Sequence, residues 1–154
     1  MPNLDSLDHE KYVQRTLALA REAGERGDGH YGSILVHENE IVMEETNREN
    51  TDDDLALHPE LTLARRAERE LSPDVRKETV MYTSTEPCPM CAGGIAIAGL
   101  GAVVYSISGE HAAEEFGGMP GVPCDEIFER KGRDIEVVSG VLKQDGLALH
   151  RKFR

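Results

Sequence analysis

The sequence predicts an α/β protein with helices on both faces of a sheet. Five short segments with strand-like composition alternate along the chain with segments of helical length and pattern. No internal repeat, low-complexity stretch or linker interrupts the alternation. Strands that alternate with helices are typical of a sheet buried on both sides. We therefore expect residues 1–154 to form a single domain, for which this length is ordinary.

The N-terminal part of the chain predicts one helix and one hairpin. Residues 5–26 carry apolar side chains near the helical period, and Gly27-Asp28-Gly29 ends that helix. Residues 31–37 and 40–47 are expected to be strands. The two residues between them suit a tight turn, so the strands should pair directly.

The middle of the chain predicts a loop, two helices and two strands. Residues 48–57 form a polar, solvated loop with three consecutive aspartates. A helix over 59–71 follows and stops at the next Ser-Pro pair. Residues 79–84 are β-branched and aromatic and predict a strand, 88–98 predict a helix of small residues, and 102–107 predict another strand.

The C-terminal part gives weaker signals. Residues 109–130 are mixed, with a short helix expected from Cys124 to Arg130. Residues 135–138 predict a fifth strand. The tail after Lys143 suits a helix, although Gly146 lowers its helical propensity.

Charge and cysteine content narrow the classes of partner. Twenty-nine acidic residues against 17 basic ones give a net charge of -12, which repels phosphate backbones and disfavours a nucleic-acid partner. No apolar run is long enough to span a membrane, and the N-terminus lacks an apolar signal core, so we expect a cytoplasmic protein. Three cysteines, Cys88, Cys91 and Cys124, suit metal binding or free thiols better than a disulfide framework.

One cluster of residues has the composition of a zinc site. His58 precedes one expected helix, and Cys88 with Cys91 opens the next. Two thiolates and an imidazole are ligands that Zn²⁺ prefers, and the three-residue cysteine spacing lets both sulfurs face one ion from a single turn. A helix N-terminus also favours the thiolate form that binds metal.

Three protein ligands leave a fourth position open, as in catalytic zinc sites, where the ion makes a water molecule acidic near neutral pH. Glu60 stands two residues beyond His58. There it could take a proton from the water and deliver it to a leaving amine. We therefore expect Glu60 to be catalytic and zinc to be the cofactor.

The joint pattern His58-Pro59-Glu60 with Pro87-Cys88-Pro89-Met90-Cys91 is the established signature of zinc deaminases. The run from Thr85 to Gly93 resembles the cytidine-deaminase-like superfamily, in the branch of guanine deaminase, fungal cytosine deaminase and tRNA adenosine deaminase. The resemblance implies a three-layer α/β/α fold with a mixed five-stranded sheet, and commonly a homodimer. It also implies that Asn47, 11 residues before His58, hydrogen-bonds the substrate base.

Two departures from the family pattern concern the substrate pocket, which we expect to include Asn47, Pro59, Pro87 and His30. The family usually has Ala or Gly where this chain has Pro59, and a proline where it has His30. Proline has no N–H, so a contact from that backbone position to a substrate acceptor is lost. We expect cytosine to be a poor substrate and a guanine-like purine to be slightly favoured.

Three classes of function stay open. A deaminase of a free base, nucleoside or related amino-heterocycle fits the open zinc position. A tRNA adenosine deaminase would use the same chemistry but needs a basic groove. A non-enzymatic module would need a fourth ligand, for which Cys124 or another histidine is available.

If it is not a metal ligand, Cys124 is expected to be a buried apolar residue. Phe153 could cover the pocket, and surface positions are expected for four histidines: His9, His37, His111 and His150.

Overall fold

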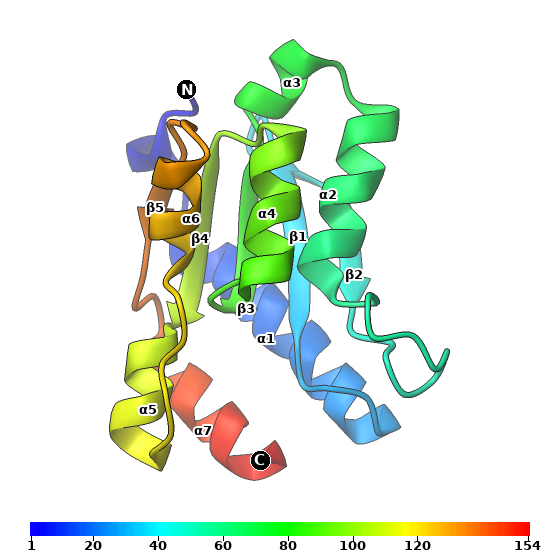
Figure 1. Ribbon diagram of the computed structural model, residues 1–154, viewed down its shortest axis with the longest axis vertical. Coiled ribbons are helices and arrows are strands. Elements are labelled where there is room, and N and C mark those ends of the chain that lie inside the picture. Colours follow the sequence, from blue (N-terminus) through cyan, green and yellow to red (C-terminus); the bar gives the residue numbers. More distant parts are fainter.

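The computed structural model describes residues 1–154 and is a three-layer α/β/α sandwich (Figure 1). Five strands form one mixed sheet in the order β2-β1-β3-β4-β5. Strand β1 is antiparallel to both β2 and β3, whereas β3, β4 and β5 run parallel. The strands are β1 (Gly32–His37), β2 (Glu40–Thr46), β3 (Val80–Thr85), β4 (Ala102–Ile107) and β5 (Glu136–Val138).

Helices cover both faces of the sheet, as the sequence predicted. Helices α1 and α7 pack on one face, and α2, α4 and α6 pack on the other. Two separate apolar clusters lie between the layers. The helices are α1 (His9–Arg26), α2 (Pro59–Glu70), α3 (Pro73–Lys77), α4 (Pro89–Ala98), α5 (Gly109–Phe116), α6 (Cys124–Arg130) and α7 (Lys143–Phe153), with a 3₁₀ turn η1 (Leu4–Ser6) before them.

Backbone geometry accounts for the ends of the first elements. Asp8 caps α1 by accepting a hydrogen bond from the Lys11 N–H, and Gly27 ends the helix in the left-handed conformation. Glu38 and Asn39 both have positive φ, of 51° and 60°. That geometry belongs to the two-residue turn that matches the twist of a hairpin.

Two short helices were not predicted from the sequence. Ser72, expected only to stop α2, also caps α3 by accepting from the Val75 N–H. Ser108 caps α5 in the same way, and His111 completes a reciprocal capping box. Helix α7 forms although Gly146 has a low helical propensity. A Cβ at this position would collide with the Ser106 hydroxyl of β4. The glycine is required by close packing and not by chain flexibility.

The four histidines expected at the surface, His9, His37, His111 and His150, are all partly exposed, but three of them also make hydrogen bonds within the fold. His111 is used in the cap just described. His9 Nδ1 lies 2.7 Å from the Tyr82 hydroxyl, and His150 Nδ1 lies 2.8 Å from His30 Nε2. Both contacts join distant parts of the chain, which local sequence patterns do not reveal. No helix is long and apolar enough to cross a membrane.

Candidate metal centre and active site

The N-termini of α2 and α4 converge at one end of the sheet (Figure 1). His58 is the N-cap of α2 and Cys88 is the N-cap of α4, and neither side chain caps its own helix. A proline follows each of them, where its missing N–H costs nothing and its fixed φ suits the first turn. Both side chains are therefore left for another partner. Cys91, one turn into α4, faces the same space.

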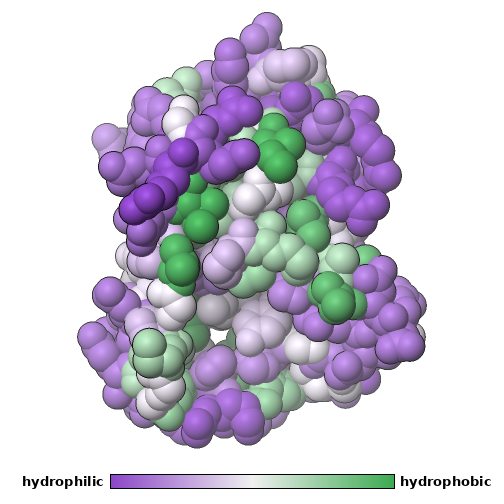
Figure 2. All heavy atoms as spheres, in the orientation of Figure 1, coloured by the Kyte–Doolittle hydropathy of each residue, from purple (hydrophilic) through white to green (hydrophobic).

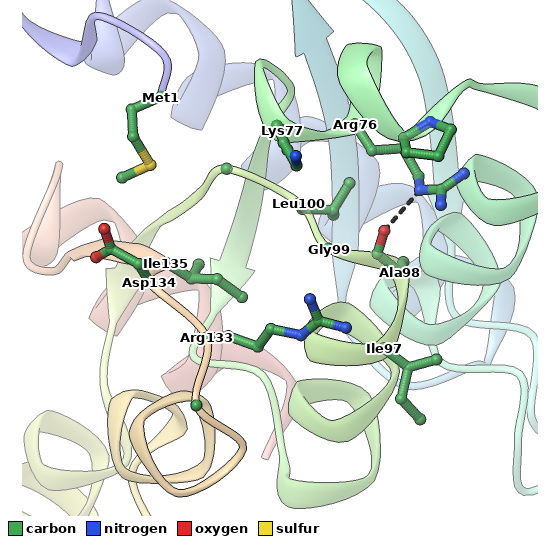
Figure 3. Close-up of a pocket in the computed structure, with 13 residues that line it drawn as sticks. Met1, Arg76, Lys77, Ile97, Ala98, Gly99, Leu100, Arg133, Asp134 and Ile135 are labelled. Atoms are coloured by element: carbon green, nitrogen blue, oxygen red, sulfur yellow. Dashed lines mark hydrogen bonds between the residues drawn. The ribbon is translucent and has the colours of Figure 1, made fainter.

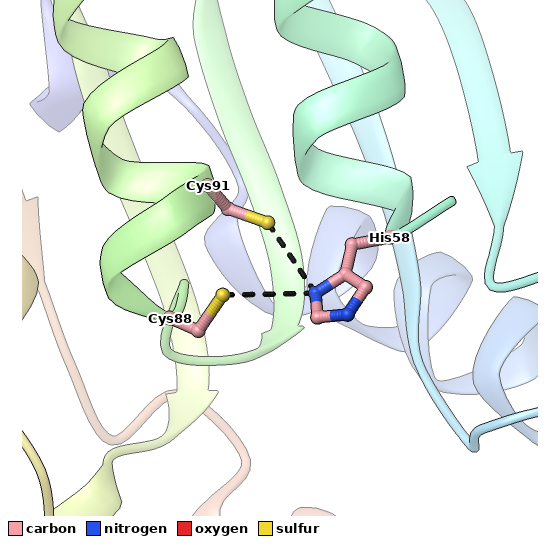
Figure 4. Close-up of side chains that lie close together, drawn as sticks. All are labelled: His58, Cys88 and Cys91. Atoms are coloured by element: carbon pink, nitrogen blue, oxygen red, sulfur yellow. Dashed lines mark hydrogen bonds between the residues drawn. The ribbon is translucent and has the colours of Figure 1, made fainter. Parts of the chain in front are cut away.

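The three predicted ligands lie together (Figure 4). His58 Nδ1 is 3.6 Å from the Cys88 sulfur and 3.5 Å from the Cys91 sulfur, and all three ligand atoms lie within 4.8 Å of one another. Tetrahedral zinc with ordinary Zn–N and Zn–S bonds separates such nitrogen and sulfur atoms by about 3.6 Å. The donor set and its spacing fit zinc without rearrangement.

The environment of the two cysteines shifts their pKa values in opposite directions. Hydrogen bonds from Cys91 and His58 lower the pKa of Cys88 to about 4, so this sulfur is a thiolate. The hydrogen bond with Cys88, followed by burial, raises the pKa of Cys91, so Cys91 keeps the shared proton in the metal-free protein. Metal binding must displace that proton. The hydrogen bond with Cys88 also raises the pKa of His58.

No fourth protein ligand completes the group. Cys124 is fully buried, as expected for a small apolar residue, and it lies against Tyr105 and Glu86. The closed structural site that Cys124 would have completed is absent. Three ligands with one position free are the arrangement of catalytic zinc sites.

Glu60 has the environment of a proton carrier. Its side chain is only 5% exposed, and its Oε1 is a buried polar atom without a hydrogen-bond partner. Burial raises the pKa of Glu60 to about 7. Buried carboxylates are normally paired, and a pKa near neutrality suits a group that both takes and gives a proton.

Asn47 is fully buried beside this centre. Its Oδ1 accepts hydrogen bonds from the Glu49 N–H at 2.9 Å and the Gly29 N–H at 3.3 Å, and its Nδ2 donates to Glu49 Oε1 at 2.8 Å. A carboxamide has two N–H groups. The contacts above use only one of them.

Sequence reasoning missed two residues of the site. Glu49 Oε1 lies 2.9 Å from His58 Nε2, although nothing in the local pattern distinguishes this glutamate from its acidic neighbours. Burial, followed by the negative charges of Glu60, Glu49 and Cys88, raises the pKa of Tyr31, which places the Tyr31 hydroxyl near the same groups. The sequence could have indicated Tyr31, because it is an aromatic residue next to the predicted pocket residue His30.

The other predicted pocket residues lie around these groups. Pro59 and Pro87 are buried next to His58 and Cys88. His30 stacks on Tyr31, with ring centroids 4.7 Å apart, and on Phe153 at 5.9 Å. The Phe153 ring also packs against Gly24, where a Cβ would collide with it. The C-terminal helix is therefore fixed beside the pocket residues.

A cavity of about 360 Å³ lies at the opposite end of α4 (Figure 3). Its lining includes Arg76, Leu100 and Arg133 and none of the predicted ligands. The Arg76 guanidinium donates to the carbonyl oxygens of Ala98 and Leu71, each at 2.6 Å, and of Glu68 at 3.3 Å. Arg76 therefore binds the C-terminal carbonyl groups of two helices, which is a structural role.

Two thiols, an imidazole and a carboxylate with one unpaired buried oxygen are the groups that a zinc hydrolase site requires. The profile of the "Cytidine and deoxycytidylate deaminase zinc-binding region" matches residues 6–107. The chain belongs to this family.

Relatives within the family differ in substrate. The guanine deaminase of Bacillus subtilis (strain 168) is 36% identical over 109 residues, which cover 70% of each chain. The tRNA-specific adenosine deaminase of the same strain is 29% identical over 137 residues, covering 88% of this chain and 82% of the relative. A protein solved in complex with 2,6-diaminopurine has the same fold, with a TM-score of 0.79 at 22% identity over 95% of this chain and 81% of that chain.

The findings together define a zinc-dependent deaminase of an amino-heterocycle. They confirm the predicted family, the mixed five-stranded α/β/α fold and the zinc cofactor.

Proposed function

We propose that this deaminase acts on a free purine base of the guanine type, replacing a ring amino group with oxygen and releasing ammonia. The observation that carries the reaction is the buried Glu60 carboxylate, whose Oε1 has no hydrogen-bond partner and which lies within one helical turn of His58. Guanine is favoured by the 36% identity to a guanine deaminase and by Pro59. The reaction type follows from the site itself, whereas the choice of ring follows from one relative and one residue.

In this proposal His58, Cys88 and Cys91 hold the zinc ion. Bound zinc supplies a Lewis acid that lowers the pKa of a water molecule toward 7. Glu60 takes a proton as the water oxygen bonds to the amino-bearing carbon, and passes it to the departing nitrogen. The C–N bond breaks, ammonia leaves, and Glu60 completes the cycle as a carboxylate. Its pKa of about 7 suits both transfers.

Substrate orientation is assigned to Asn47, Pro59, Pro87 and His30. Asn47 offers one free N–H, as its other hydrogen-bonding positions are filled, so it favours a ring acceptor. Pro59 offers none. A substrate carbonyl facing Pro59 is left unpaired, at a cost of about 1–3 kcal/mol, which disfavours cytosine if it binds in the pose of the family's pyrimidine deaminases. His30 would act through its stacking on Tyr31.

The test is ammonia release from a panel of guanine, adenine, cytosine and an aminotriazine, with metal analysis of the same preparation. We expect about one zinc per chain and the highest kcat/KM on guanine. A higher kcat/KM on cytosine or the triazine would overturn the guanine assignment while leaving the deaminase chemistry intact.

A tRNA adenosine deaminase is the second candidate, favoured by the 29% identical relative that covers 88% of this chain. The net charge of -12 opposes it, because attraction to phosphates supplies most non-specific affinity for nucleic acid. We expect no measurable tRNA binding even at low salt, where screening is weakest. A gel-shift titration that shows salt-sensitive binding would favour the tRNA assignment.

Three further properties are part of the proposal: one domain over residues 1–154, a cytoplasmic location, and a homodimer. Apolar surface lies over α4 on the face shown in Figure 2. Two apolar residues of this helix are exposed, Ile97 at 64% and Met90 at 38%. Exposed apolar surface of this kind favours self-association. Light scattering is the measurement, and a monomer at micromolar concentration would contradict the dimer.

A further inference from the structure

Glu49 lies between two parts of the site that the reaction uses separately. One carboxylate oxygen, Oε1, is 2.9 Å from His58 Nε2 and 2.8 Å from Asn47 Nδ2. In Figure 4 the imidazole directs Nδ1 to the two sulfurs, which leaves Nε2 on the other side of the ring. A single acceptor atom thus joins a metal ligand to the residue assigned to hold the substrate ring.

We propose that Glu49 is a positioning residue that fixes the orientation of His58 and Asn47 together; the Asn47 half of this inference rests on the proposed function. Glu49 touches neither the sulfur atoms nor, by assignment, the substrate. It acts through the two side chains that it holds.

The effect on His58 follows from the tautomers of imidazole. A neutral imidazole carries one N–H. An ionised carboxylate can only accept, so Glu49 selects the tautomer with the hydrogen on Nε2. In the zinc-bound protein Nδ1 would then present its lone pair to the ion that the two sulfurs also hold. The same contact prevents rotation of the ring away from Cys88 and Cys91.

The effect on Asn47 follows from its hydrogen-bond inventory. Two backbone N–H groups fill Oδ1, and Glu49 takes one hydrogen of Nδ2. Glu49 reinforces the amide orientation that the two backbone donors favour, since a flip would set Oδ1 against the carboxylate. The free group is always a donor, so the substrate must present an acceptor to Asn47.

The loop that carries Glu49 is held in place by contacts that do not involve the Glu49 side chain. Asp28 of the opposite layer accepts from the Asn50 N–H at 3.0 Å, the Thr51 N–H at 2.8 Å and the Thr51 hydroxyl at 2.6 Å. The Glu49 side chain is itself 35% exposed. Replacement of Glu49 should therefore leave the loop and the fold intact.

The first test measures zinc affinity by competition with a chromophoric chelator, with Tm recorded in parallel. We expect Glu49→Ala to bind zinc about 10- to 100-fold more weakly, as is usual on loss of such a partner. Glu49→Gln should lose less, because its amide oxygen still accepts from Nε2. The control is Asp52→Ala, which removes an exposed ion pair with Arg48 in the same loop and should leave affinity unchanged. Wild-type zinc affinity in Glu49→Ala would overturn the inference for His58.

The second test observes the side-chain amide of Asn47 by NMR, with its signals identified by their loss in Asn47→Ala. We expect Glu49→Ala to shift these signals and speed their exchange with water, and Asp52→Ala to leave them in place. Unchanged Asn47 signals in Glu49→Ala would overturn the inference for Asn47. On guanine, the loss should appear as a raised KM, with Glu49→Ala adding little to Asn47→Ala.

Neither of the first two readouts needs turnover. A wild-type protein that deaminates no ring on the panel would defeat the proposed function, while chelator competition and NMR would still decide the role of Glu49.

Discussion

Helices α2 and α4 have opposite surroundings at their two ends. Their N-termini meet at His58 and Cys88, where the three candidate metal ligands lie together and Oε1 of the buried Glu60 has no partner. Their C-terminal carbonyls meet at Arg76, whose guanidinium donates to three of them. Each end follows the helix dipole, with a thiolate at the positive end and a cation at the negative end. Hydrogen bonding is complete at one end and incomplete at the other.

The difference separates stability from chemistry. The cavity in Figure 3 lies at the Arg76 end, where the buried groups are satisfied. The reactive groups lie at the end where a polar atom is left free for a ligand. In this protein the unpaired buried atom marks the proposed active site, whereas the cavity lies away from it.

The largest expected effect is at the N-terminal end. Glu60→Gln should lower kcat about 10²–10⁴-fold, because a carboxamide cannot carry the proton, while zinc stays bound. Stability should equal or exceed that of wild type, since a buried carboxylate is replaced by a neutral group. Steady-state kinetics, metal analysis and thermal unfolding measure the three quantities.

Cys88→Ala is the contrasting variant, because it should lose zinc and activity together. Turnover within a few-fold of wild type in Glu60→Gln would show that another group moves the proton.

The C-terminal end should give the reverse result. Arg76→Met removes the donor to three carbonyl groups and should lower the free energy of unfolding by about 2–4 kcal/mol, with kcat on the preferred ring unchanged. Denaturant unfolding measures it. Arg133→Met is the control, because Arg133 lines the same cavity but is exposed; it should be neutral. A fall in kcat in folded Arg76→Met would break the separation between the two ends.

A smaller effect is expected from restoring one donor at the N-terminal end. Pro59→Ala should raise kcat/KM on cytosine about 5- to 150-fold, which corresponds to about 1–3 kcal/mol for one buried hydrogen bond, and should change guanine turnover much less. The comparison is made on both rings with wild type and variant. Efficient cytosine turnover by wild type, with no gain in the variant, would show that the missing N–H does not control selectivity.

The smallest effect concerns the aromatic cluster beside the pocket. Burial, followed by the charge of His150, lowers the pKa of His30 to about 4, and burial lowers the pKa of His150. Unfolded histidine titrates near 6.5, so the unfolded chain binds more protons below that pH. Stability from these rings is complete above about pH 6.5 and is lost toward pH 4, at no more than about 1.4 kcal/mol per pH unit for each proton.

Urea unfolding between pH 4.5 and 7 measures this slope, and His150→Gln should flatten it. An equal slope in wild type and His150→Gln would assign the acid sensitivity to other groups.

The proposed ligands and the proposed catalytic carboxylate could be predicted from the sequence because they lie at short spacings along the chain. His58 and Glu60 share one helical turn, and Cys88 and Cys91 share another. The strand and helix order followed from periodicity for the same reason. Contacts such as His30 with His150, 120 residues apart, have no local pattern.

Glu49 shows the limit most clearly. Its identity as a partner of His58 depends on the shape of the loop over residues 48–57, and Asp28 on another layer sets that shape. Helices α3 and α5 were missed because single serine caps define them. A polar cap followed by a few unpatterned residues is equally consistent with a turn.

The hydrogen bonds from the loop over residues 48–57 to Asp28 also affect the rate at which that loop opens. Asn50 and Thr51 are exposed, yet their backbone amides donate to the Asp28 carboxylate. Those amides exchange their hydrogens with water only when the loop opens, so their exchange rates report the opening directly. Hydrogen bonds with Thr51 and Arg26 hold the pKa of Asp28 well below its usual range, so the Asp28 carboxylate stays charged and keeps these contacts as the pH falls. A substitution of Asp28, just beyond the end of α1, would then change how fast the loop opens.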